Sequence, residues 1–221
     1  MITLDGPAGS GKSTAARLLA AQLGFQYLDT GGLYRAATLK AMEQGVRWDD
    51  KERLAELVRT STFDVRGGDS SGSPAGILID GRDVTDRIRT PELTANIHHL
   101  ADAPLVRREM NAHQRALVAG RDVVAEGRDL GTVIFPAAEF KFYLDATHET
   151  RVRRRRLELQ AAGIDRAEAE LGEDVRRRDE RDQMRAVAPL RCPDDAVRVD
   201  TTHRSIDQIV AFLVRTVRRE I

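Results

Sequence analysis

Residues 2–14 read Ile2-Thr3-Leu4-Asp5-Gly6-Pro7-Ala8-Gly9-Ser10-Gly11-Lys12-Ser13-Thr14, and this stretch decides the fold class. A short apolar strand comes first, and residues 6–13 then fit the pattern G-x-x-x-x-G-K-[ST]. Residues 12–23 continue with leucines at helical spacing, and Gly24 follows where such a helix would stop. A strand, a glycine-rich loop and a helix in this order predict a phosphate-binding loop, or P-loop, whose backbone N–H groups face an anion.

The chemistry of this loop indicates a nucleoside triphosphate. Glycines permit positive φ angles and let the backbone wrap a phosphate. Lys12 supplies a mobile charge for the β- and γ-phosphates, and the Ser13 hydroxyl is suited to Mg²⁺. We therefore predict a nucleoside triphosphate site with a magnesium cofactor, formed by Gly6, Pro7, Ala8, Gly9, Ser10, Gly11, Lys12, Ser13 and Thr14.

The rest of the chain alternates short apolar runs with helical patterns, which predicts an α/β fold with a parallel sheet. We expect strands at 2–5, 25–29, 123–125, 140–144 and 197–200. Helices are expected at 12–23, 33–44 and 50–59, from 90, from 104 to about 120, and from 147, 165 and 205. Residues 63–66 and 77–80 break this rhythm and predict a small antiparallel insertion with a mobile Gly/Ser-rich tip at 67–76.

Composition excludes several classes of protein. The chain has 221 residues, 41% hydrophobic and 32% charged, which favours a folded domain over a disordered one. Its formal net charge is zero, so no overall field draws it to nucleic acid or to a membrane surface. A single cysteine, the absence of a signal-like N-terminus and the lack of a long apolar run favour a cytoplasmic location. Only four of the 35 basic residues are lysines, and a GC-rich coding bias explains most of that excess of arginine.

The class of P-loop protein can be narrowed further. No Asn-Lys-x-Asp motif of a GTPase is present. The run 123–126 ends in one carboxylate, Glu126, and not in the acidic pair typical of a helicase or a transporter ATPase. Many arginines after strand ends favour a kinase that phosphorylates a small anionic acceptor.

Four blocks of sequence resemble bacterial cytidylate kinase: residues 6–14, 28–35 (Leu-Asp-Thr-Gly-Gly-Leu-Tyr-Arg), 126–136 (Glu-Gly-Arg-Asp-Leu-Gly-Thr-Val-Ile-Phe-Pro) and 178–190. The resemblance implies transfer of the γ-phosphate of ATP to CMP or dCMP, giving ADP and CDP or dCDP. It also implies a three-layer P-loop NTPase fold with a five-stranded parallel sheet. On this basis we expect a core at 1–60 and 90–221, an insertion at 61–89 that binds the nucleoside monophosphate, and a short lid region at 147–180.

The resemblance also assigns the acceptor residues. It places Arg35, Arg128 and Arg185 on the acceptor phosphate, where each guanidinium can form a bidentate fork. Asp129 and Arg107 would read the cytosine amino group and the N3 and O2 acceptors, although Asp129 could instead fix a loop. The further acceptor residues are Thr30, Arg178 and Asp182, the last two suited either to the ribose or to a plain intrahelical ion pair.

Several other roles stay open at this stage. His98 stands where the family often has a small hydroxyl residue, and it could donate to cytosine or lie on a helix surface. The run 151–156 is partly a solvated face, and we expect Arg151 and Arg155 to act on the triphosphate when the lid closes, so that the catalytic set is Lys12, Arg128, Arg151 and Arg155. Glu126 could order the water shell of Mg²⁺ or anchor a loop.

Three other functions are weighed against a cytidylate kinase. A different P-loop kinase, acting on UMP or another acceptor, would keep the same fold. A nucleotide-dependent nucleic-acid-binding module would use the arginines at 151–156, but zero net charge and few aromatic residues count against it. A sensor without turnover is disfavoured by Lys12 and the full acceptor set. The expected partners are ATP and CMP or dCMP, with no nucleic acid, no membrane and a monomeric state.

Overall fold

A computed structural model describes residues 1–67, 76–161 and 163–220. Five strands form one sheet in the order β2-β6-β1-β7-β8, and three more form a second sheet in the order β3-β4-β5. The predicted α/β fold with a five-stranded sheet is thereby confirmed. The chain divides into two compact units, residues 1–19 with 126–221, and residues 20–125. These boundaries follow neither the predicted insertion at 61–89 nor the predicted lid at 147–180, which stay predictions.

The first unit is built on β1 (Ile2–Asp5), β7 (Phe140–Asp145) and β8 (Val197–Asp200). These strands pair in parallel, with Ile2 opposite Phe140 and Phe142 opposite Val197. Every residue of β1 is buried, as expected for a central parallel strand. Helix α1 (Lys12–Leu23) begins inside the P-loop, and α9 (Ile206–Glu220) ends the described chain. The loop therefore follows directly from a strand that is held in the sheet.

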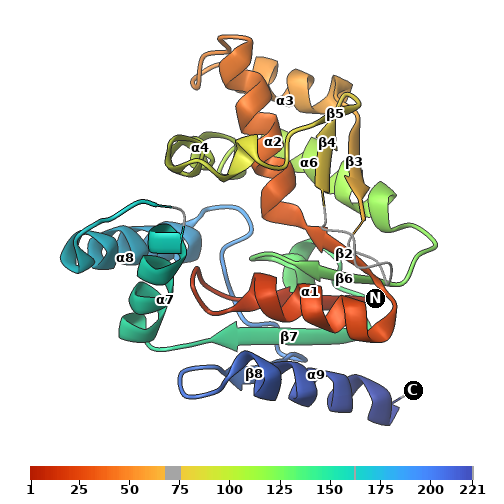
Figure 1. Cartoon of the computed structure of the whole chain (residues 1–221). Coiled ribbons are helices and arrows are strands. Elements are labelled where there is room, and N and C mark those ends of the chain that lie inside the picture. The colour runs from red at the N-terminus through yellow and green to blue at the C-terminus, as the bar shows by residue number, and fades with distance from the viewer. Residues whose placement is uncertain (68–75, 162, 221) are drawn as a thin grey trace. The chain divides into compact units, whose positions relative to one another are not determined.

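Two further helices of the first unit, α7 (His148–Ala161) and α8 (Glu168–Met184), lie side by side (Figure 1). They share a small core of their own. Two buried side chains from each helix form this core: Val152, Leu159, Leu171 and Val175. Ile164, in the connection between the helices, packs against them. This shared core lets the two helices hold the charged side chains on their other faces in fixed positions.

The second unit contains β2 (Gln26–Asp29), α2 (Thr30–Glu43), α3 (Lys51–Thr60) and α6 (Pro104–Val118). Between α3 and α6 lie β3 (Phe63–Arg66), β4 (Gly76–Ile79), β5 (Arg82–Asp83), a 3-10 turn at Arg87–Arg89, α4 (Pro91–Asn96) and α5 (His98–Ala101). Strand β6 (Val123–Glu126) follows α6. The small sheet lies beside α2 (Figure 1), and its contacts with α2 help to fix the position of that helix.

Several local predictions are confirmed. Helix 12–23 and strand 197–200 have the predicted bounds. Thr90 caps α4 through its side chain, which accepts from the N–H of Leu93, and Pro91 stands in the first turn. The helix predicted from Leu33 begins earlier, at Thr30, because Asp29 caps it by accepting from the N–H of Gly32.

The insertion is antiparallel as predicted, with Phe63 opposite Ile79, but it has a third strand that the prediction missed. Asp80 and Gly81 connect β4 to β5 with φ angles of 51° and 74°. An Asp-Gly pair with two positive φ angles is a tight hairpin turn, so a signal for this strand was present. Of the tip predicted to be mobile, residues 68–75 lie outside the described residues.

Candidate active site

The P-loop uses glycine where its backbone runs against neighbouring chain. Gly6 has φ 144°, and a Cβ there would overlap the carbonyl group of Leu144 in β7. Gly9 has φ 75°, and a Cβ there would meet Arg151 at 2.9–3.1 Å. Any other residue would be strained at both positions, which explains why the loop carries glycine at these places.

Lys12 lies buried at the start of α1. Its Nζ donates to the carbonyl oxygen of Pro7 at 2.7 Å, and Ser10 Oγ lies 3.4 Å away. Burial, followed by the positive charge of Arg128, lowers the pKa of Lys12 to about 7, while Glu126 and Asp5 act in the opposite direction. A phosphate group close to Lys12 would favour its charged form, so the lysine is suited to hold an anion.

Three consecutive carbonyl groups of the P-loop are held by side chains from later in the chain. Arg151 Nη1 donates to the carbonyl of Ala8 at 3.3 Å, and Arg154 Nη1 donates to that of Gly9 at 3.4 Å. The hydroxyl of Thr201, which is fully buried, lies 3.0 Å from the carbonyl of Ser10 and 2.9 Å from that of Asp145. These contacts fix the outer side of the loop. Neither Arg154 nor Thr201 is among the predicted catalytic or binding residues, although Arg154 lies one helical turn after Arg151, on the side of the helix expected to face the triphosphate.

Asp5, the last residue of β1, fixes the turn after β6. Its two carboxylate oxygens accept the N–H groups of Leu130 at 2.9 Å and Gly131 at 2.8 Å. Burial raises the pKa of Asp5 to about 6, although both backbone hydrogen bonds lower it. The strand that precedes the P-loop therefore also holds the backbone beside Asp129, a link between distant segments that the sequence did not reveal.

The first unit also gathers a cluster of predicted acceptor residues. Arg128 Nε donates to Oδ2 of Asp182 at 2.9 Å, and Arg185 Nη2 lies 3.7 Å from the other oxygen of that carboxylate. Burial alone would raise the pKa of Asp182, but the charges of Arg128, Arg178 and Arg185 outweigh it and hold that pKa below its usual value. Asp129 and Glu126 are also buried. Arg128, Arg178 and Arg185 thus gather around Asp182, and the charges of Arg128 and Arg178 also act on Lys12.

The two arginines predicted to act in the lid have different surroundings. Arg151 is buried, pairs with Asp179 at 2.6 Å and also donates to the carbonyl of Ala146 at 3.1 Å. Arg155 pairs with Glu158, one helical turn away, and its side chain is 36% exposed. Arg151 is therefore fixed against the P-loop, whereas Arg155 lies at the surface of α7.

In the second unit, Asp29 orients the side chain of Arg35, which lies near the start of α2. Asp29 accepts from the N–H of Gly32 at 2.8 Å through one oxygen and pairs with Arg35 at 2.6 Å through the other. Thr30 is buried in the same turn. The Asp29 carboxylate therefore both caps α2 and orients the guanidinium of Arg35. Asp29 was not among the predicted site residues, although it lies in the block 28–35 together with Thr30 and Arg35.

Arg107 lies in the first turns of α6 and is also buried. Its guanidinium carbon lies 5.9 Å from the centre of the Tyr34 ring, and Nη1 donates to the carbonyl of Ala101 at 3.1 Å. The ring contact joins α6 to α2, so Arg35 and Arg107 belong to one arrangement in this unit.

His98 lies in a stack of rings. Its ring centre is 3.9 Å from that of His99, which lies parallel to Trp48 at 4.9 Å. His98 Nδ1 is 2.7 Å from the carbonyl oxygen of Ala95. These contacts explain the position of the His98 ring without a bound nucleotide. A role of His98 as a donor to cytosine stays a prediction.

Within the described part of the chain, no three His, Cys, Asp or Glu side chains cluster in a way that could hold a metal ion. Mg²⁺ does not need such a cage, since it commonly uses one or two protein oxygens together with substrate phosphates and water. The Ser13 hydroxyl and the buried Glu126 carboxylate fit that limited donor set. A separate finding is that no helix among the described residues has the length and apolar character to cross a membrane.

Comparisons with known proteins show the family to which the chain is similar. A family model described as "Cytidylate kinase" matches residues 2–219. A cytidylate kinase of Rhodopirellula baltica is 42% identical over 218 residues, covering 99% of this chain and 92% of that protein. One of Carboxydothermus hydrogenoformans is 42% identical over 219 residues, covering 99% of this chain and 97% of that protein. A crystal structure of an uncharacterised protein from Eubacterium ventriosum superposes with a TM-score of 0.51 at 11% identity, covering 99% and 97% of the two chains, and supports the fold alone.

Proposed function

The chain belongs to the cytidylate kinase family, and we propose that it transfers the γ-phosphate of ATP to CMP or dCMP, giving ADP and CDP or dCDP. The observation that carries this proposal is the position of Lys12. It is a buried P-loop lysine that lies close enough to Arg128 and Arg178 for both charges to lower its pKa. Glu126, Asp5 and Asp182 offset part of this positive charge, and the anionic phosphates of a donor and an acceptor are suited to the remainder.

On the donor side, the P-loop residues 6–14 bind the triphosphate of ATP. The N–H groups of the loop and of the first turn of α1 bind the phosphates, and Lys12 neutralises the oxygens nearest to the transferred group. Ser13 and Glu126 would hold Mg²⁺, Glu126 through water. The ion supplies charge neutralisation between the phosphate groups when it is bound.

On the acceptor side, Arg35, Arg128 and Arg185 bind the monophosphate. An acceptor phosphate is already ionised near neutral pH, so the reaction needs little from a general base. What the protein must supply is the removal of repulsion between two anions, and fixed guanidinium groups do this without reorganising during the reaction. The ion pair of Arg128 with Asp182 supports this role because it presets the direction of the guanidinium.

Selection of the base is assigned to Asp129 and Arg107. A carboxylate accepts from the amino group of cytosine, whereas uracil presents a carbonyl oxygen at that position and would repel it. Because both side chains are buried, a mismatched base would leave a polar group without its partner, which is the strongest form of discrimination available to such a site. Arg178, Asp182 and Thr30 are assigned to the remainder of the nucleotide.

The arginines of α7 divide into two roles. Arg151 holds the P-loop from outside through Ala8, and it is tied to α8 through Asp179. Arg155 is left to reach the transferring phosphate when α7 and α8 close, where a guanidinium can be worth about a thousandfold in rate. Closure would also exclude water and so limit hydrolysis of ATP.

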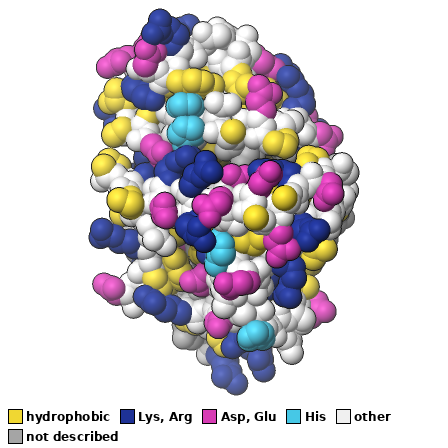
Figure 2. Space-filling view, turned by 90° about the vertical axis from the view of Figure 1, so that its left-hand side faces the viewer, with side chains coloured by type: hydrophobic (Ala, Val, Ile, Leu, Met, Phe, Trp, Pro, Cys, Tyr) yellow, Lys and Arg dark blue, Asp and Glu magenta, His cyan; other side chains and the backbone are white. Residues whose placement is uncertain are grey.

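A nucleic-acid-binding module is less well supported. Figure 2 shows Lys and Arg side chains interleaved with Asp and Glu on the face it presents, without a continuous basic surface. Arginines of α7 and of its connection to α8 are also neutralised, since Arg155, Arg156 and Arg166 each pair with a carboxylate. Neutralised arginines release few counterions and give little non-specific affinity.

The test is formation of ADP from MgATP with CMP, dCMP, UMP, AMP and GMP, offered one at a time. Turnover with CMP or dCMP and little with purines supports the proposal. Comparable rates with CMP and UMP would contradict the role of Asp129. An Asp129→Asn variant should lose its preference for CMP over UMP. Asp195→Asn serves as its control, because Asp195 is an exposed carboxylate of the same unit that pairs with Lys141 and has no proposed role in binding. No turnover with any acceptor, while ATP still binds, would overturn the proposal in favour of a sensor or a different acceptor.

A further inference from the structure

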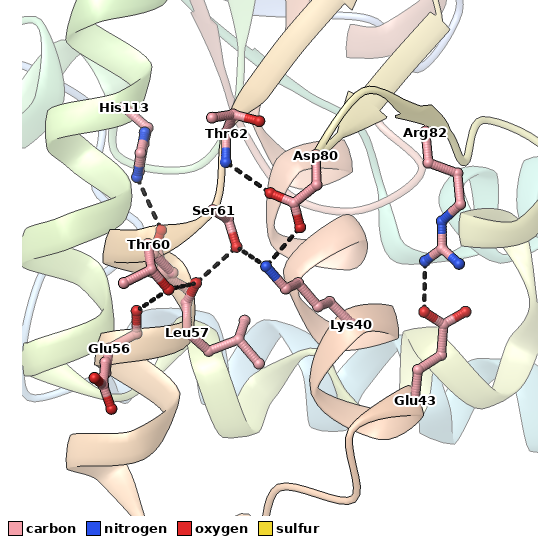
Figure 3. A network of polar contacts seen from close by, with 11 residues as sticks. Lys40, Glu43, Glu56, Leu57, Thr60, Ser61, Thr62, Asp80, Arg82 and His113 are labelled. Atoms are coloured by element: carbon pink, nitrogen blue, oxygen red, sulfur yellow. Dashed lines mark hydrogen bonds and ion pairs between the residues drawn. The ribbon is translucent and has the colours of Figure 1, made fainter.

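Lys40 joins three elements of the second unit (Figure 3). Its Nζ, near the end of α2, donates to Ser61 Oγ at 2.8 Å and pairs with Asp80 Oδ2 at 2.6 Å. Ser61 caps the end of α3, and Asp80 lies in the turn between β4 and β5. The Lys40 side chain is only 15% exposed, so its ammonium group depends on these partners for its stability.

The partners of Lys40 are themselves held. Ser61 Oγ donates to the carbonyl of Leu57 at 2.6 Å. Asp80 is paired with Thr62 twice, because Oδ1 accepts the Thr62 N–H at 2.9 Å and the Asp80 N–H donates to the Thr62 carbonyl at 2.9 Å. Each oxygen of the Asp80 carboxylate thus has its own partner, and the carboxylate cannot turn without losing one of them.

The same turn of α3 also receives a side chain from α6. His113 Nε2 lies 2.9 Å from the carbonyl oxygen of Val58, and the ring meets Phe63 edge-on with centres 4.9 Å apart. Figure 3 shows His113 reaching this turn from one side and Lys40 from the other. We call this set the α3 junction: Lys40, Ser61, Thr62, Asp80 and His113, with the carbonyl groups of Leu57 and Val58.

The two helices that meet at the α3 junction are those that carry the acceptor residues of this unit. Helix α2 holds Arg35 five residues before Lys40, and α6 holds Arg107 six residues before His113. The small sheet also contacts α2 near its start, because a Cβ on Gly32 would overlap Ile77 of β4. Because a helix is stiff over such short distances, a shift of α2 or α6 at the junction would carry Arg35 or Arg107 with it.

We propose that Lys40 is a positioning residue for the acceptor nucleotide, acting through the α3 junction on Arg35 and Arg107. This inference rests on the proposed function of those two arginines. Lys40 touches no substrate in this account. Its ion pair with Asp80 locks α2 to the small sheet and to the end of α3, and this lock keeps the acceptor arginines at the spacing that CMP requires.

The test compares Lys40→Met with the wild type in steady-state kinetics. Methionine keeps the apolar stem and removes the ammonium group. We expect the KM for CMP to rise about tenfold, below the ~100-fold that a displacement of ~1 Å can cost, with the KM for ATP changed less than about twofold. Direct titration of CMP into the enzyme should show the same weakening. Lys40→Arg, which retains the charge and can reach Asp80, should recover part of the loss.

Two controls separate positioning from a general loss of structure. Arg53→Met removes an exposed ion pair with Glu56 on the same helix and should leave both KM values unchanged. In a double-mutant cycle, Lys40→Met with Asp80→Asn should weaken CMP binding no more than Lys40→Met alone, because both remove one lock. Asparagine still allows the positive φ angle of this turn.

The outcomes are distinguishable. An unchanged KM for CMP in Lys40→Met, or an equal rise for ATP and CMP, would overturn the inference while leaving the proposed function intact. If the wild type itself fails to phosphorylate CMP, the proposed function fails first. A fully additive double mutant would show that Lys40 and Asp80 act separately, which also contradicts the proposed lock.

Discussion

The guanidinium of Arg128 and the carboxylate of Asp182 meet at 2.9 Å although the residues are 54 positions apart, and both side chains are largely buried. The pair joins the turn after β6 to helix α8. Arg128 is thereby held in one direction before any phosphate arrives, and α8 is tied to the segment that carries Asp129. An ion pair of this kind links the position of α8 to the position of Arg128, a residue proposed to bind the acceptor phosphate.

Removal of the Asp182 charge should weaken both folding and CMP binding. Asp182→Asn leaves Arg128 buried without its counter-charge, and we expect a loss of about 1–3 kcal/mol in unfolding free energy at pH 7 together with a higher KM for CMP. The native pKa of Asp182 is lowered, so its contribution is present above the unfolded pKa and is lost as pH falls through the native value. In urea denaturation, the unfolding free energies of the wild type and of Asp182→Asn should therefore approach each other as the pH falls. A difference in unfolding free energy that stays constant with pH would contradict the lowered pKa of Asp182.

ATP binding should take up a proton at alkaline pH. The native pKa of Lys12 is lowered to about 7, and a bound triphosphate would raise it because opposite charge favours the ammonium form. At about pH 8, titration calorimetry in buffers of different ionisation enthalpy should show net proton uptake, and affinity should fall as pH rises through about 7. Lys12→Met should abolish the uptake. Buffer-independent heats in the wild type would show that Lys12 is already charged.

Replacement of Arg151 should lower mainly stability and ATP binding, whereas replacement of Arg155 should lower mainly kcat. Arg151→Met breaks the buried pair with Asp179 and the contact with Ala8, so we expect a loss of about 3 kcal/mol in unfolding free energy and weaker ATP binding. Arg155→Met should leave thermal stability unchanged because its pair with Glu158 is exposed, yet lower kcat strongly. Rapid-quench measurement of the chemical step separates the two. If Arg155→Met turns over at the wild-type rate, Arg155 has no part in the transfer.

Asp5 should show a pH dependence opposite to that of Asp182. Its native pKa is raised to about 6 from 3.8, so the native state binds the proton more tightly and the Asp5 contribution to stability grows as pH falls from above 6 toward 4. Asp5→Asn lacks this titration and also turns an amide N–H toward Leu130 or Gly131. The stability difference between wild type and variant should be larger at about pH 5 than at about pH 7.5 by chemical denaturation. The reverse order would contradict a raised pKa.

The local parts of the fold could be predicted from the sequence because their causes are local. The P-loop, the strand before it and the helix at 12–23 depend on glycines, on spacing of apolar residues and on a stop signal within a few positions. Thr90 and Pro91 likewise begin a helix through contacts within one turn. The strand at Arg82–Asp83 was missed although the Asp80-Gly81 turn signalled it, because two residues are too few to show a period.

The candidate site divides in the same way. The residue types that follow each strand can be read directly from the sequence, and Arg128 and Asp129 were predicted as site residues from the block 126–136. The contacts of Asp5 with the backbone of Leu130 and Gly131, and of Thr201 with the carbonyl of Ser10, depend on how the chain packs in three dimensions. Side chains that serve distant backbone leave no period or spacing in the chain, because their partners are set by strand order and by helix packing, which arise only when the whole core is assembled.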